Sequence, residues 1–401
     1  MKQCYLHRTK NKTSNKMNST PKCPHFNSCG GCSLQHIHYE LTLVNKKAYV
    51  TNQLKKFDII VPEQVEIKHT AEYNYRNRMD FVFFDLGLGL RQKDQFDKII
   101  KINNCAIASE KINILKLEIE EWFNKIKVEP FNLRTKKGTM KYALIRACEF
   151  NDDSCISFAL SSESAQLATH IDLIKDFAKK TTAKNVMIAR IPSNHDASTS
   201  DDYFCIKGTQ YLEENFLGKK MKYHSEGFFQ NNPTTASLMV QKAGDILSNY
   251  DTTNSNLLDL YGGIGTFGVC LADKFKKTII IESVKDSIDC AKMNILSNNI
   301  SNAEAHVLDS AKMIKVVSKG NLFCITDPPR SGMTRQAIEN LLSLEPEVII
   351  YISCNPQQFA KEMIVFKKKY DMKSLTIFDM FPQTNHIESM AELVIRKEAI
   401  K

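Results

Sequence analysis

A cysteine at the end of a predicted strand has the residue type and the position to do chemistry. The apolar run 348–352 stops abruptly at Ser353-Cys354-Asn355-Pro356, and such a run is typical of a buried parallel strand. Pro356 cannot extend a strand ladder, and it favours an extended or turn conformation at Asn355. Cys354 is therefore predicted at the carboxyl edge of a sheet, where α/β proteins bind ligands. Its sulfur could be a nucleophile, although a strand-end thiol taken alone is more simply a buried apolar residue.

Three further cysteines near the N-terminus have a C-x5-C-x2-C spacing: Cys23, Cys29 and Cys32. This spacing can surround one small inorganic centre, and two glycines between the last two cysteines let the backbone fold closely around it. A structural zinc ion would need a fourth Cys or His ligand, for which the nearby candidates are His25, His36 and His38. An iron–sulfur cluster would prefer a fourth thiolate, and Cys105 could supply it.

Composition limits the classes of protein that this chain can be. Its 401 residues predict two or three domains, and 43% hydrophobic residues are enough to build their cores. No apolar run reaches membrane-spanning length and no signal peptide is recognisable, which predicts a soluble, cytoplasmic protein. Twelve cysteines without an export signal argue against a disulfide scaffold. The net charge of +9 is compatible with a polyanionic partner but does not require one.

Changes in pattern along the chain predict four segments. Residues 1–20 are polar and basic, as in a disordered arm. Residues 21–70 contain the three cysteines and then an amphipathic helix, with Val44 among its apolar positions and Lys46 on its outer side. Residues 71–219 mix short strands and helices without a βαβ rhythm, which predicts an α+β domain. Within it, Tyr75-Arg76-Asn77-Arg78 suits contacts with RNA phosphates and bases, or equally a solvated strand edge.

Residues 220–401 alternate strands and helices, which predicts a doubly wound parallel sheet ending in two edge strands, 375–378 and 391–395. The apolar strand 257–260 runs into a glycine turn that lacks both the lysine of a P-loop and the G-x-G-x-x-G pattern. Glu282, at the end of the next strand, can accept hydrogen bonds from the ribose of an adenine nucleoside. A nicotinamide cofactor would also use a glycine turn and an acidic residue at the end of the next strand.

The loop Asp327-Pro328-Pro329-Arg330 places polar groups at the same sheet edge, where a flat base could lie. It has neither the aromatic residue expected for amino-group methylation nor the cysteine expected for methylation of cytosine at carbon 5. Carbon 5 of uracil is a poor nucleophile, and addition of a thiolate at carbon 6 turns the ring into an enolate that can accept a methyl group. Removing the carbon-5 proton then requires a base. Glu388 could be that base, with His386 as its competitor.

These motifs together resemble the S-adenosylmethionine-dependent RNA uracil-5-methyltransferases. The resemblance runs from Cys23 to Ile395 and is carried by C-x5-CGGC, FFQNN, DLYGGIGTFG, DPPRSG, YISCNP and DMFPQTNHIE. It implies a C-terminal Rossmann-like methyltransferase sheet, with the α+β domain and the cysteine segment before it. It also implies that Cys354 is the nucleophile and Glu388 the base, with Arg330 positioning RNA or polarising the uracil.

The resemblance further implies two cofactor sites. The methyl donor S-adenosylmethionine would contact Gln230, Tyr261, Glu282, Asp309 and Asp327. A [4Fe–4S] cluster, with a structural or RNA-organising role, would be held by Cys23, Cys29, Cys32 and Cys105. Many members begin with a small β-barrel RNA-binding domain, whereas this chain has a short arm. The resemblance to shorter members predicts a monomer that acts on 23S ribosomal RNA, with the T-loop of transfer RNA as the alternative target.

Two functions of other kinds stay open at this point. An RNA cytosine-5-methyltransferase would usually need a second thiol in the Pro-Pro loop, and none is present. A noncatalytic iron–sulfur RNA-binding protein could have kept the same fold. The joint presence of Cys354 and Glu388 argues against that reading.

Overall fold

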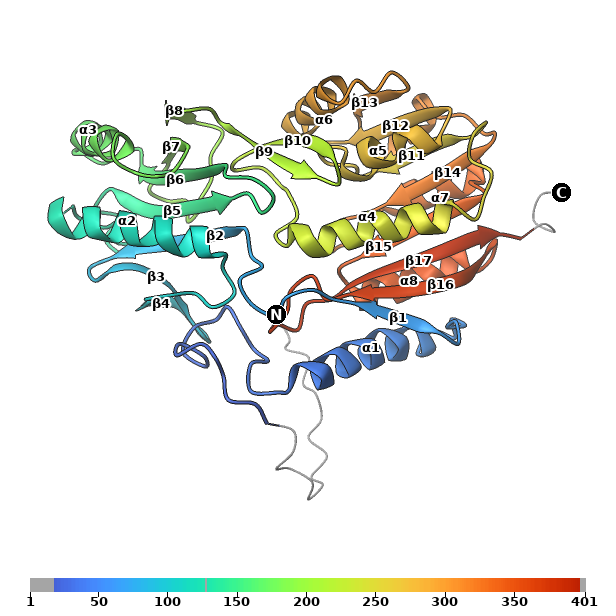
Figure 1. Ribbon diagram of the computed structural model, residues 1–401, viewed down its shortest axis with the longest axis horizontal. Coiled ribbons are helices and arrows are strands. Elements are labelled where there is room, and N and C mark those ends of the chain that lie inside the picture. The colour runs from blue at the N-terminus through green and yellow to red at the C-terminus, as the bar shows by residue number, and fades with distance from the viewer. Residues whose placement is uncertain (1–17, 127, 397–401) are drawn as a thin grey trace.

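The computed structural model describes residues 18–126 and 128–396, which form two large sheets flanked by helices (Figure 1). Most of the predicted arm, residues 1–20, lies outside this range. Its last residues are paired rather than free, because Asn18 forms a β-bridge with Ile37 and the Ser19 N–H donates to the His36 carbonyl at 2.9 Å. None of the described helices is both long and apolar enough to cross a membrane.

The C-terminal sheet has eight strands in the order β1-β16-β17-β15-β14-β11-β12-β13. They are β1 (Val65–Lys68), β11 (Asn256–Leu260), β12 (Lys277–Glu282), β13 (Ala303–Val307), β14 (Leu322–Thr326), β15 (Val348–Ser353), β16 (Tyr370–Phe378) and β17 (Glu388–Ile395). Only β17 runs antiparallel to its neighbours. All six residues of β15 are buried, as expected of a strand covered on both faces.

Helices cover both faces of this sheet and make a three-layer domain (Figure 1). One face packs against α4 (Pro233–Leu247), α5 (Thr266–Leu271) with the short 3-10 helix η2 (Ala272–Lys274), and α6 (Lys285–Ser297). The other packs against α1 (Tyr39–Lys55), the 3-10 helix η3 (Ser310–Lys315), α7 (Arg335–Leu344) and α8 (Pro356–Phe366). The predicted doubly wound α/β fold is confirmed.

The prediction of two edge strands at the C-terminus is wrong. β16 and β17 lie inside the sheet, and the edge beside them is β1, a four-residue strand too short to show a periodic pattern. Both β1 and α1 pack with the C-terminal domain, whereas Cys29 and Cys32 pack against the core of the central sheet. The predicted segment 21–70 is thus divided. Cys29 and Cys32 pack with the central sheet, whereas α1 and β1 pack with the C-terminal sheet.

The predicted outer position of Lys46 on the first helix is also wrong. Lys46 is 4% exposed, and its ammonium nitrogen lies 2.6 Å from the Asp379 carboxylate. Val44, predicted on the apolar face, is 61% exposed. The reason is helical phase: the helix begins at Tyr39, so apolar residues between Cys32 and Tyr39 do not belong to its pattern.

The central sheet has seven strands in the order β4-β3-β2-β5-β6-β7-β8. They are β2 (Arg78–Phe84), β3 (Gly87–Gln92), β4 (Gln95–Lys101), β5 (Met140–Ala147), β6 (Ser154–Ser161), β7 (Asn185–Ile191) and β8 (Tyr203–Lys207). Two helices, α2 (Glu110–Ile126) and α3 (Leu167–Ala178), share one apolar core with it. The α+β prediction missed one βαβ unit, since β6 and β7 are parallel and joined through α3.

A hairpin joins the two bodies. It consists of β9 (Tyr211–Phe216) and β10 (Lys219–His224), which were not predicted, and the predicted boundary at 219/220 falls after the first residue of β10. Tyr223 of β10 stacks on Phe229, with ring centroids 4.4 Å apart. The chain then enters α4, where the Asn232 side chain accepts a hydrogen bond from the Thr235 N–H and caps the helix.

Candidate active site

Strand pairing brings Cys354 and Glu388 together. Cys354 follows β15 and Glu388 begins β17; these strands pair antiparallel with Ser353 opposite Ser389. The next step along the same ladder sets Cys354 beside Glu388. The Ser389 hydroxyl reinforces the register by donating to the Ser353 carbonyl at 3.2 Å. The one antiparallel strand of the sheet thus delivers a carboxyl group to the strand end that carries the thiol.

Both side chains line a cavity of about 540 Å³, called here the strand-edge cavity. It gathers most of the predicted site residues: Gln230, Tyr261, Glu282, Asp327, Arg330, Cys354 and Glu388. Four phenylalanines to which motif reasoning gave no role also line it: Phe228, Phe229, Phe267 and Phe381. Asp309 is the exception among the predicted residues. It is exposed, does not line the cavity, and accepts a 2.8 Å hydrogen bond from the Ala311 N–H as the cap of η3.

The glycine turn exposes backbone to the strand-edge cavity. Tyr261, Gly263 and Gly265 all have positive φ angles, of 61°, 55° and 83°. A Cβ on Gly262 would lie 2.7 Å from a side-chain carbon of Ile280, so the close approach of turn and strand requires glycine there. The turn can therefore present peptide groups to a ligand where side chains would block it.

Hydrogen bonds set the orientation of the acidic residues around this turn. Asp259 accepts a 2.7 Å hydrogen bond from the Gly268 N–H, which ties β11 to the start of α5. One carboxylate oxygen of Glu282 accepts from the N–H groups of Ser283 at 2.6 Å and Val284 at 2.9 Å. Glu282 is thus held at the wall of the cavity, where the sequence predicted a ribose contact.

Burial controls the protonation of the reactive pair. It raises the pKa of Glu388 well above the ordinary value; the Asp327 charge raises it further and Arg330 opposes this. Burial raises the pKa of Asp327 to about 7. For Cys354, burial and then the charges of Glu388 and Asp327 raise the pKa to about 11, while Arg330 lowers it. The free protein therefore keeps the Cys354 proton near neutral pH, and Glu388 has the raised pKa that suits a proton acceptor.

His386 contacts Arg330 and does not line the strand-edge cavity. An Nη2 of Arg330 lies 2.9 Å from His386 Nδ1, and the Arg330 carbonyl accepts a 3.0 Å bond from the Asn355 side chain. Burial lowers the pKa of His386, as do the charges of Arg330, Lys46 and Arg76. Because Glu388 lines the strand-edge cavity and His386 does not, Glu388 is the better placed of the two candidate bases.

The loop before Glu388 is anchored from two directions. Asp379 accepts hydrogen bonds from Lys46 at 2.6 Å and from the Tyr39 hydroxyl at 2.9 Å, both on or at the start of α1. The Tyr75 hydroxyl donates to the Pro382 carbonyl at 2.9 Å. Tyr75 is only 4% exposed, so this residue, predicted for RNA contact, instead supports the loop.

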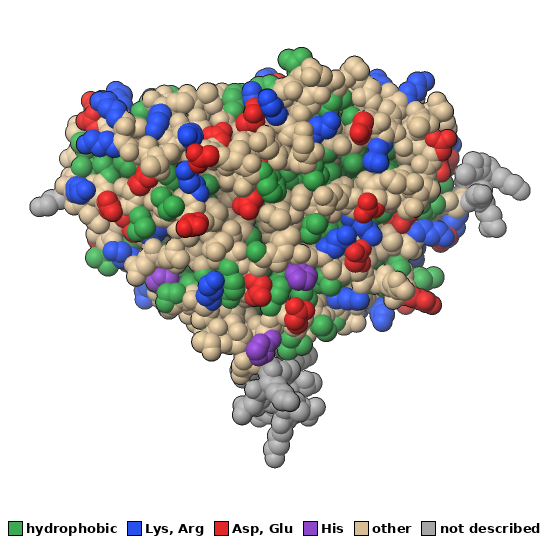
Figure 2. Space-filling model, in the orientation of Figure 1, with side chains coloured by type: hydrophobic (Ala, Val, Ile, Leu, Met, Phe, Trp, Pro, Cys, Tyr) green, Lys and Arg blue, Asp and Glu red, His purple; other side chains and the backbone are tan. Residues whose placement is uncertain are grey.

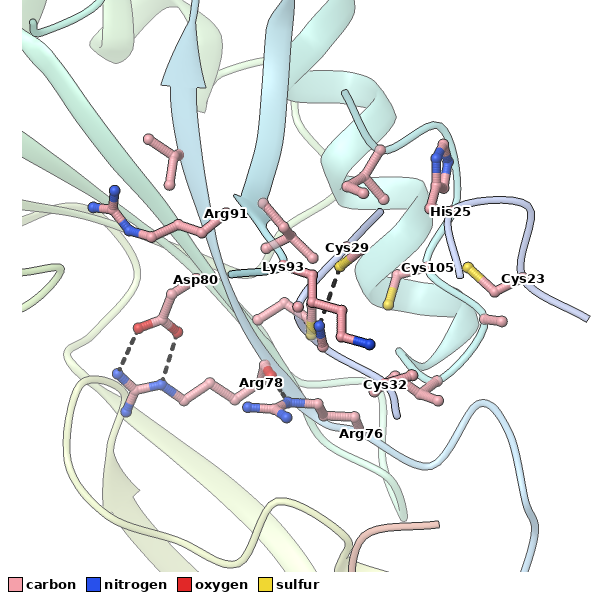
Figure 3. Close-up of a pocket in the computed structure, with 18 of the residues that line it drawn as sticks. Cys23, His25, Cys29, Cys32, Arg76, Arg78, Asp80, Arg91, Lys93 and Cys105 are labelled. Atoms are coloured by element: carbon pink, nitrogen blue, oxygen red, sulfur yellow. Dashed lines mark hydrogen bonds and ion pairs between the residues drawn. The ribbon is translucent and has the colours of Figure 1, made fainter. Parts of the chain in front are cut away.

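The four predicted cluster cysteines line a second cavity, of about 750 Å³, called here the cysteine cavity. Figure 3 shows Cys23, Cys29 and Cys105 near one another, with Arg78, Asp80 and Arg91 on the opposite side. The Gly31 N–H donates to Cys29 Sγ at 3.3 Å. Burial, with smaller contributions from the other cysteines, raises the pKa of Cys32 to about 12.

The groups around this cavity that could bind a metal include four thiols and a histidine. Among the described residues, no three His, Cys, Asp or Glu side chains form a group that could hold a metal ion. His25 also lines the cavity, but its Nε2 accepts a 3.3 Å bond from the Asn103 N–H, and the ring of His36 packs on Phe26. Four thiols around one cavity are the ligand type that iron–sulfur clusters take.

Charge on one face of the molecule (Figure 2) is interspersed rather than gathered. On the face shown in Figure 2, Lys and Arg side chains of the described residues alternate with Asp and Glu. Cations do gather inside the cysteine cavity, whose lining includes Arg76, Arg78, Arg91, Lys93 and Arg146. Asp80 and Asp94 line the same cavity, and Asp80 pairs with Arg78.

Comparison with known proteins gives matches over most of the chain. A family model described as tRNA (Uracil-5-)-methyltransferase matches residues 38–396. An uncharacterized RNA methyltransferase of Caldanaerobacter subterraneus is 31% identical over 379 residues, covering 91% of this chain and 83% of the relative. The tRNA (uracil(54)-C(5))-methyltransferase of Pyrococcus abyssi is 28% identical over 376 residues, covering 93% and 86%.

A solved structure agrees with these matches. The crystal structure of Pyrococcus abyssi tRNA (uracil-54, C5)-methyltransferase in complex with S-adenosyl-L-homocysteine aligns with a TM-score of 0.76 and 26% identity. It covers 91% of this chain and 86% of that one. The family match includes every residue of the strand-edge cavity but begins after the three N-terminal cysteines.

Proposed function

This chain belongs to the tRNA (uracil-5-)-methyltransferase family, and on that premise we propose that it methylates carbon 5 of one uridine in RNA through a covalent Cys354 adduct. It is a methyltransferase that uses S-adenosylmethionine. The observation that carries the proposal is the placement of Cys354 and Glu388 side by side in a cavity that also contains the glycine turn. Family membership and the Cys354–Glu388 pair together disfavour the cytosine-5 and noncatalytic alternatives.

The proposed reaction has three steps on the uracil ring. The Cys354 thiolate adds to carbon 6, and the electrons of the carbon 5–carbon 6 double bond form an enolate. Carbon 5 then takes the methyl group from the sulfonium, which leaves as S-adenosylhomocysteine. Glu388 removes the carbon-5 proton, the double bond reforms, and the carbon 6–sulfur bond breaks to return the thiolate.

The methyl donor is proposed to bind along the glycine turn. Four of the five residues predicted to contact it line the strand-edge cavity: Gln230, Tyr261, Glu282 and Asp327. The Tyr261 hydroxyl is fixed by a 2.7 Å bond from Ser310, which supports its role as a positioned wall of the site. Asp309 stays a prediction, since its carboxylate caps η3 instead.

We also propose that Cys23, Cys29, Cys32 and Cys105 hold a [4Fe–4S] cluster. The four thiols line one cavity, and the peptide N–H groups of Ile107 and Ala108 lower the pKa of the buried Cys105 against the effect of burial. Such a centre would supply structural crosslinking between the N-terminal segment and the central sheet. We assign it no step in methyl transfer.

Two RNA targets are proposed, in 23S ribosomal RNA and in transfer RNA. The sequence resemblance favoured ribosomal RNA. Relatives from Pyrococcus abyssi and Pyrococcus horikoshii are named tRNA (uracil(54)-C(5))-methyltransferases, and this observation favours transfer RNA. We propose that the protein acts as a monomer in the cytoplasm.

The deciding experiment maps 5-methyluridine in total RNA with and without the gene. Loss of one 5-methyluridine from transfer RNA, with ribosomal RNA unchanged, would assign transfer RNA as the target and exclude ribosomal RNA. Loss from ribosomal RNA, with transfer RNA unchanged, would assign ribosomal RNA and exclude transfer RNA. Re-expression of the wild-type gene should restore the modification, and re-expression of Cys354→Ala should not. An unchanged 5-methyluridine map in both RNAs would contradict the proposed activity.

A further inference from the structure

An exposed aromatic ring stands at the end of the β3–β4 hairpin. Phe96, on β4, is 71% exposed, although most large apolar side chains of this protein are buried. The guanidinium carbon of Arg91, on β3, lies 4.1 Å from the centroid of its ring. One face of the phenyl ring is therefore covered by a cation. Because the Phe96 side chain is mostly exposed, the ring is available to a flat partner. A phenyl ring with a cation on one face favours stacking.

Arg91 is held firmly under that ring. Its guanidinium donates to the Phe96 carbonyl at 2.7 Å, to the Tyr142 hydroxyl at 2.6 Å and to the Asp196 carboxylate at 2.7 Å. The Tyr142 hydroxyl also donates to Asp196. Because every partner comes from a different part of the central domain, little side-chain entropy remains to be lost when a ligand stacks on this pair.

The hairpin is also fixed to the cysteine segment. The Gly30 N–H donates to the Arg91 carbonyl at 3.2 Å, and the Lys93 N–H donates to the Ser28 carbonyl at 2.8 Å. Its tip is thus tied to the rest of the protein, which distinguishes it from a freely moving surface turn.

The ring is connected to the reactive pair by a continuous lining. Phe96, Arg91 and Arg78 line the cysteine cavity, which Phe228 also lines. Phe228 is 65% exposed and lines the strand-edge cavity with Cys354 as well. A strand of RNA whose uridine enters the strand-edge cavity would therefore pass along arginines toward Phe96.

We propose that Phe96, backed by Arg91, is a stacking platform for an unpaired base of the substrate RNA, outside the cavity that takes the target uridine. This inference rests on the proposed RNA methyltransferase function and names a contact beyond it. An RNA base fits because it offers a flat apolar face to the ring, and base–aromatic stacking tolerates any sequence. The flanking phosphates would face Arg78 and Arg76.

The test measures binding of a fluorescein-labelled, unstructured 20-nucleotide RNA of mixed sequence by fluorescence anisotropy. Phe96→Ala should raise Kd by about fivefold or more, because this is the loss in affinity that removing one base–aromatic stacking contact usually causes. Phe96→Trp should keep wild-type affinity, and Leu86→Ala should change nothing. Leu86 is the matched control, because it is 63% exposed in the turn between β2 and β3 and lines neither cavity.

Two further readouts separate stacking from charge and from misfolding. The slope of log Kd against log salt should be the same in Phe96→Ala and wild type, because removing a ring releases no counterions. A blunt RNA duplex of the same length should bind both proteins equally, since its bases are already stacked. A Phe96→Ala protein with wild-type Kd for the single strand would overturn the platform, while 5-methyluridine formation by the wild type would still stand as the separate test of the proposed function.

Discussion

The backbone N–H of Ser33 donates to the carbonyl oxygen of Gln383 at 3.0 Å, and the Leu34 N–H donates to the same oxygen at 3.1 Å. Ser33 directly follows Cys32, and Gln383 lies in the loop that leads to Glu388. Gln383 is 2% exposed and has a φ angle of 66°, a conformation that costs free energy unless neighbours enforce it. The cysteine segment is thus one of the supports of the proposed catalytic loop.

Loss of the proposed cluster should loosen that loop. Protein purified without oxygen should be brown and contain iron, and Cys29→Ser should be colourless. In the variant, the amides of residues 383–387 should exchange with deuterium faster than in the wild type. The reason is that the segment Cys32–Leu34, which donates hydrogen bonds to Gln383, is no longer fixed by the cluster. Cys205→Ser, a thiol on β8 away from the cavity, should match the wild type. A zinc-containing wild type, or unchanged exchange in a variant shown to lack iron, would contradict this account.

The buried ion pair between Lys46 and Asp379 should be essential for stability. Lys46→Met leaves the Asp379 carboxylate, at 0% exposure, without its cation. Breaking a buried pair from one side typically costs about 3–5 kcal/mol, so the free energy of unfolding in urea should fall by about that amount. Lys55→Met, an exposed lysine on the same helix, should change it by less than about 0.5 kcal/mol. Equal stabilities for the two variants would show that the pair contributes nothing.

The Cys354 thiol should react slowly in the free protein. Because burial and two carboxylates raise its pKa to about 11, the thiolate fraction should grow about tenfold per pH unit throughout pH 7 to 9.5. Iodoacetamide alkylation of Cys354, followed by peptide mass spectrometry, should rise with the same slope. Arg330→Gln should lower the alkylation rate at every pH, because it removes the cation that lowers the pKa of Cys354. A plateau below pH 8.5 would mean that the free protein already stabilises the thiolate.

Local patterns predicted the chemistry of the site better than its assembly. Cys354 could be placed at a strand end because an apolar run stops there, and Glu388 could be proposed because the chemistry needs a base. Their adjacency depends on β17 entering antiparallel between β15 and β16. Strand order is a long-range property that no local period contains, which is why β16 and β17 were predicted at an edge.

Other errors have equally physical causes. Lys46 was placed outside because helical phase depends on where the helix begins, and only the tertiary partner Asp379 makes a lysine suitable for the inner face. Asp309, predicted from the family resemblance to contact the methyl donor, caps η3, a role for which this residue type is favoured, and its contact with the donor stays a prediction. The helix α8 was not predicted, although its start carries the same Asn-Pro signal that begins α4.

The central claim is that Cys354 attacks carbon 6 of a uracil and that Glu388 then removes the carbon-5 proton. RNA carrying 5-fluorouracil at the mapped position tests it directly, because fluorine cannot leave as a proton does. With S-adenosylmethionine present, wild-type protein should form a denaturant-resistant protein–RNA adduct whose peptide map places the RNA on Cys354, and Cys354→Ala should form none. Folded wild-type protein that methylates the unmodified RNA yet gives no such adduct would contradict the account.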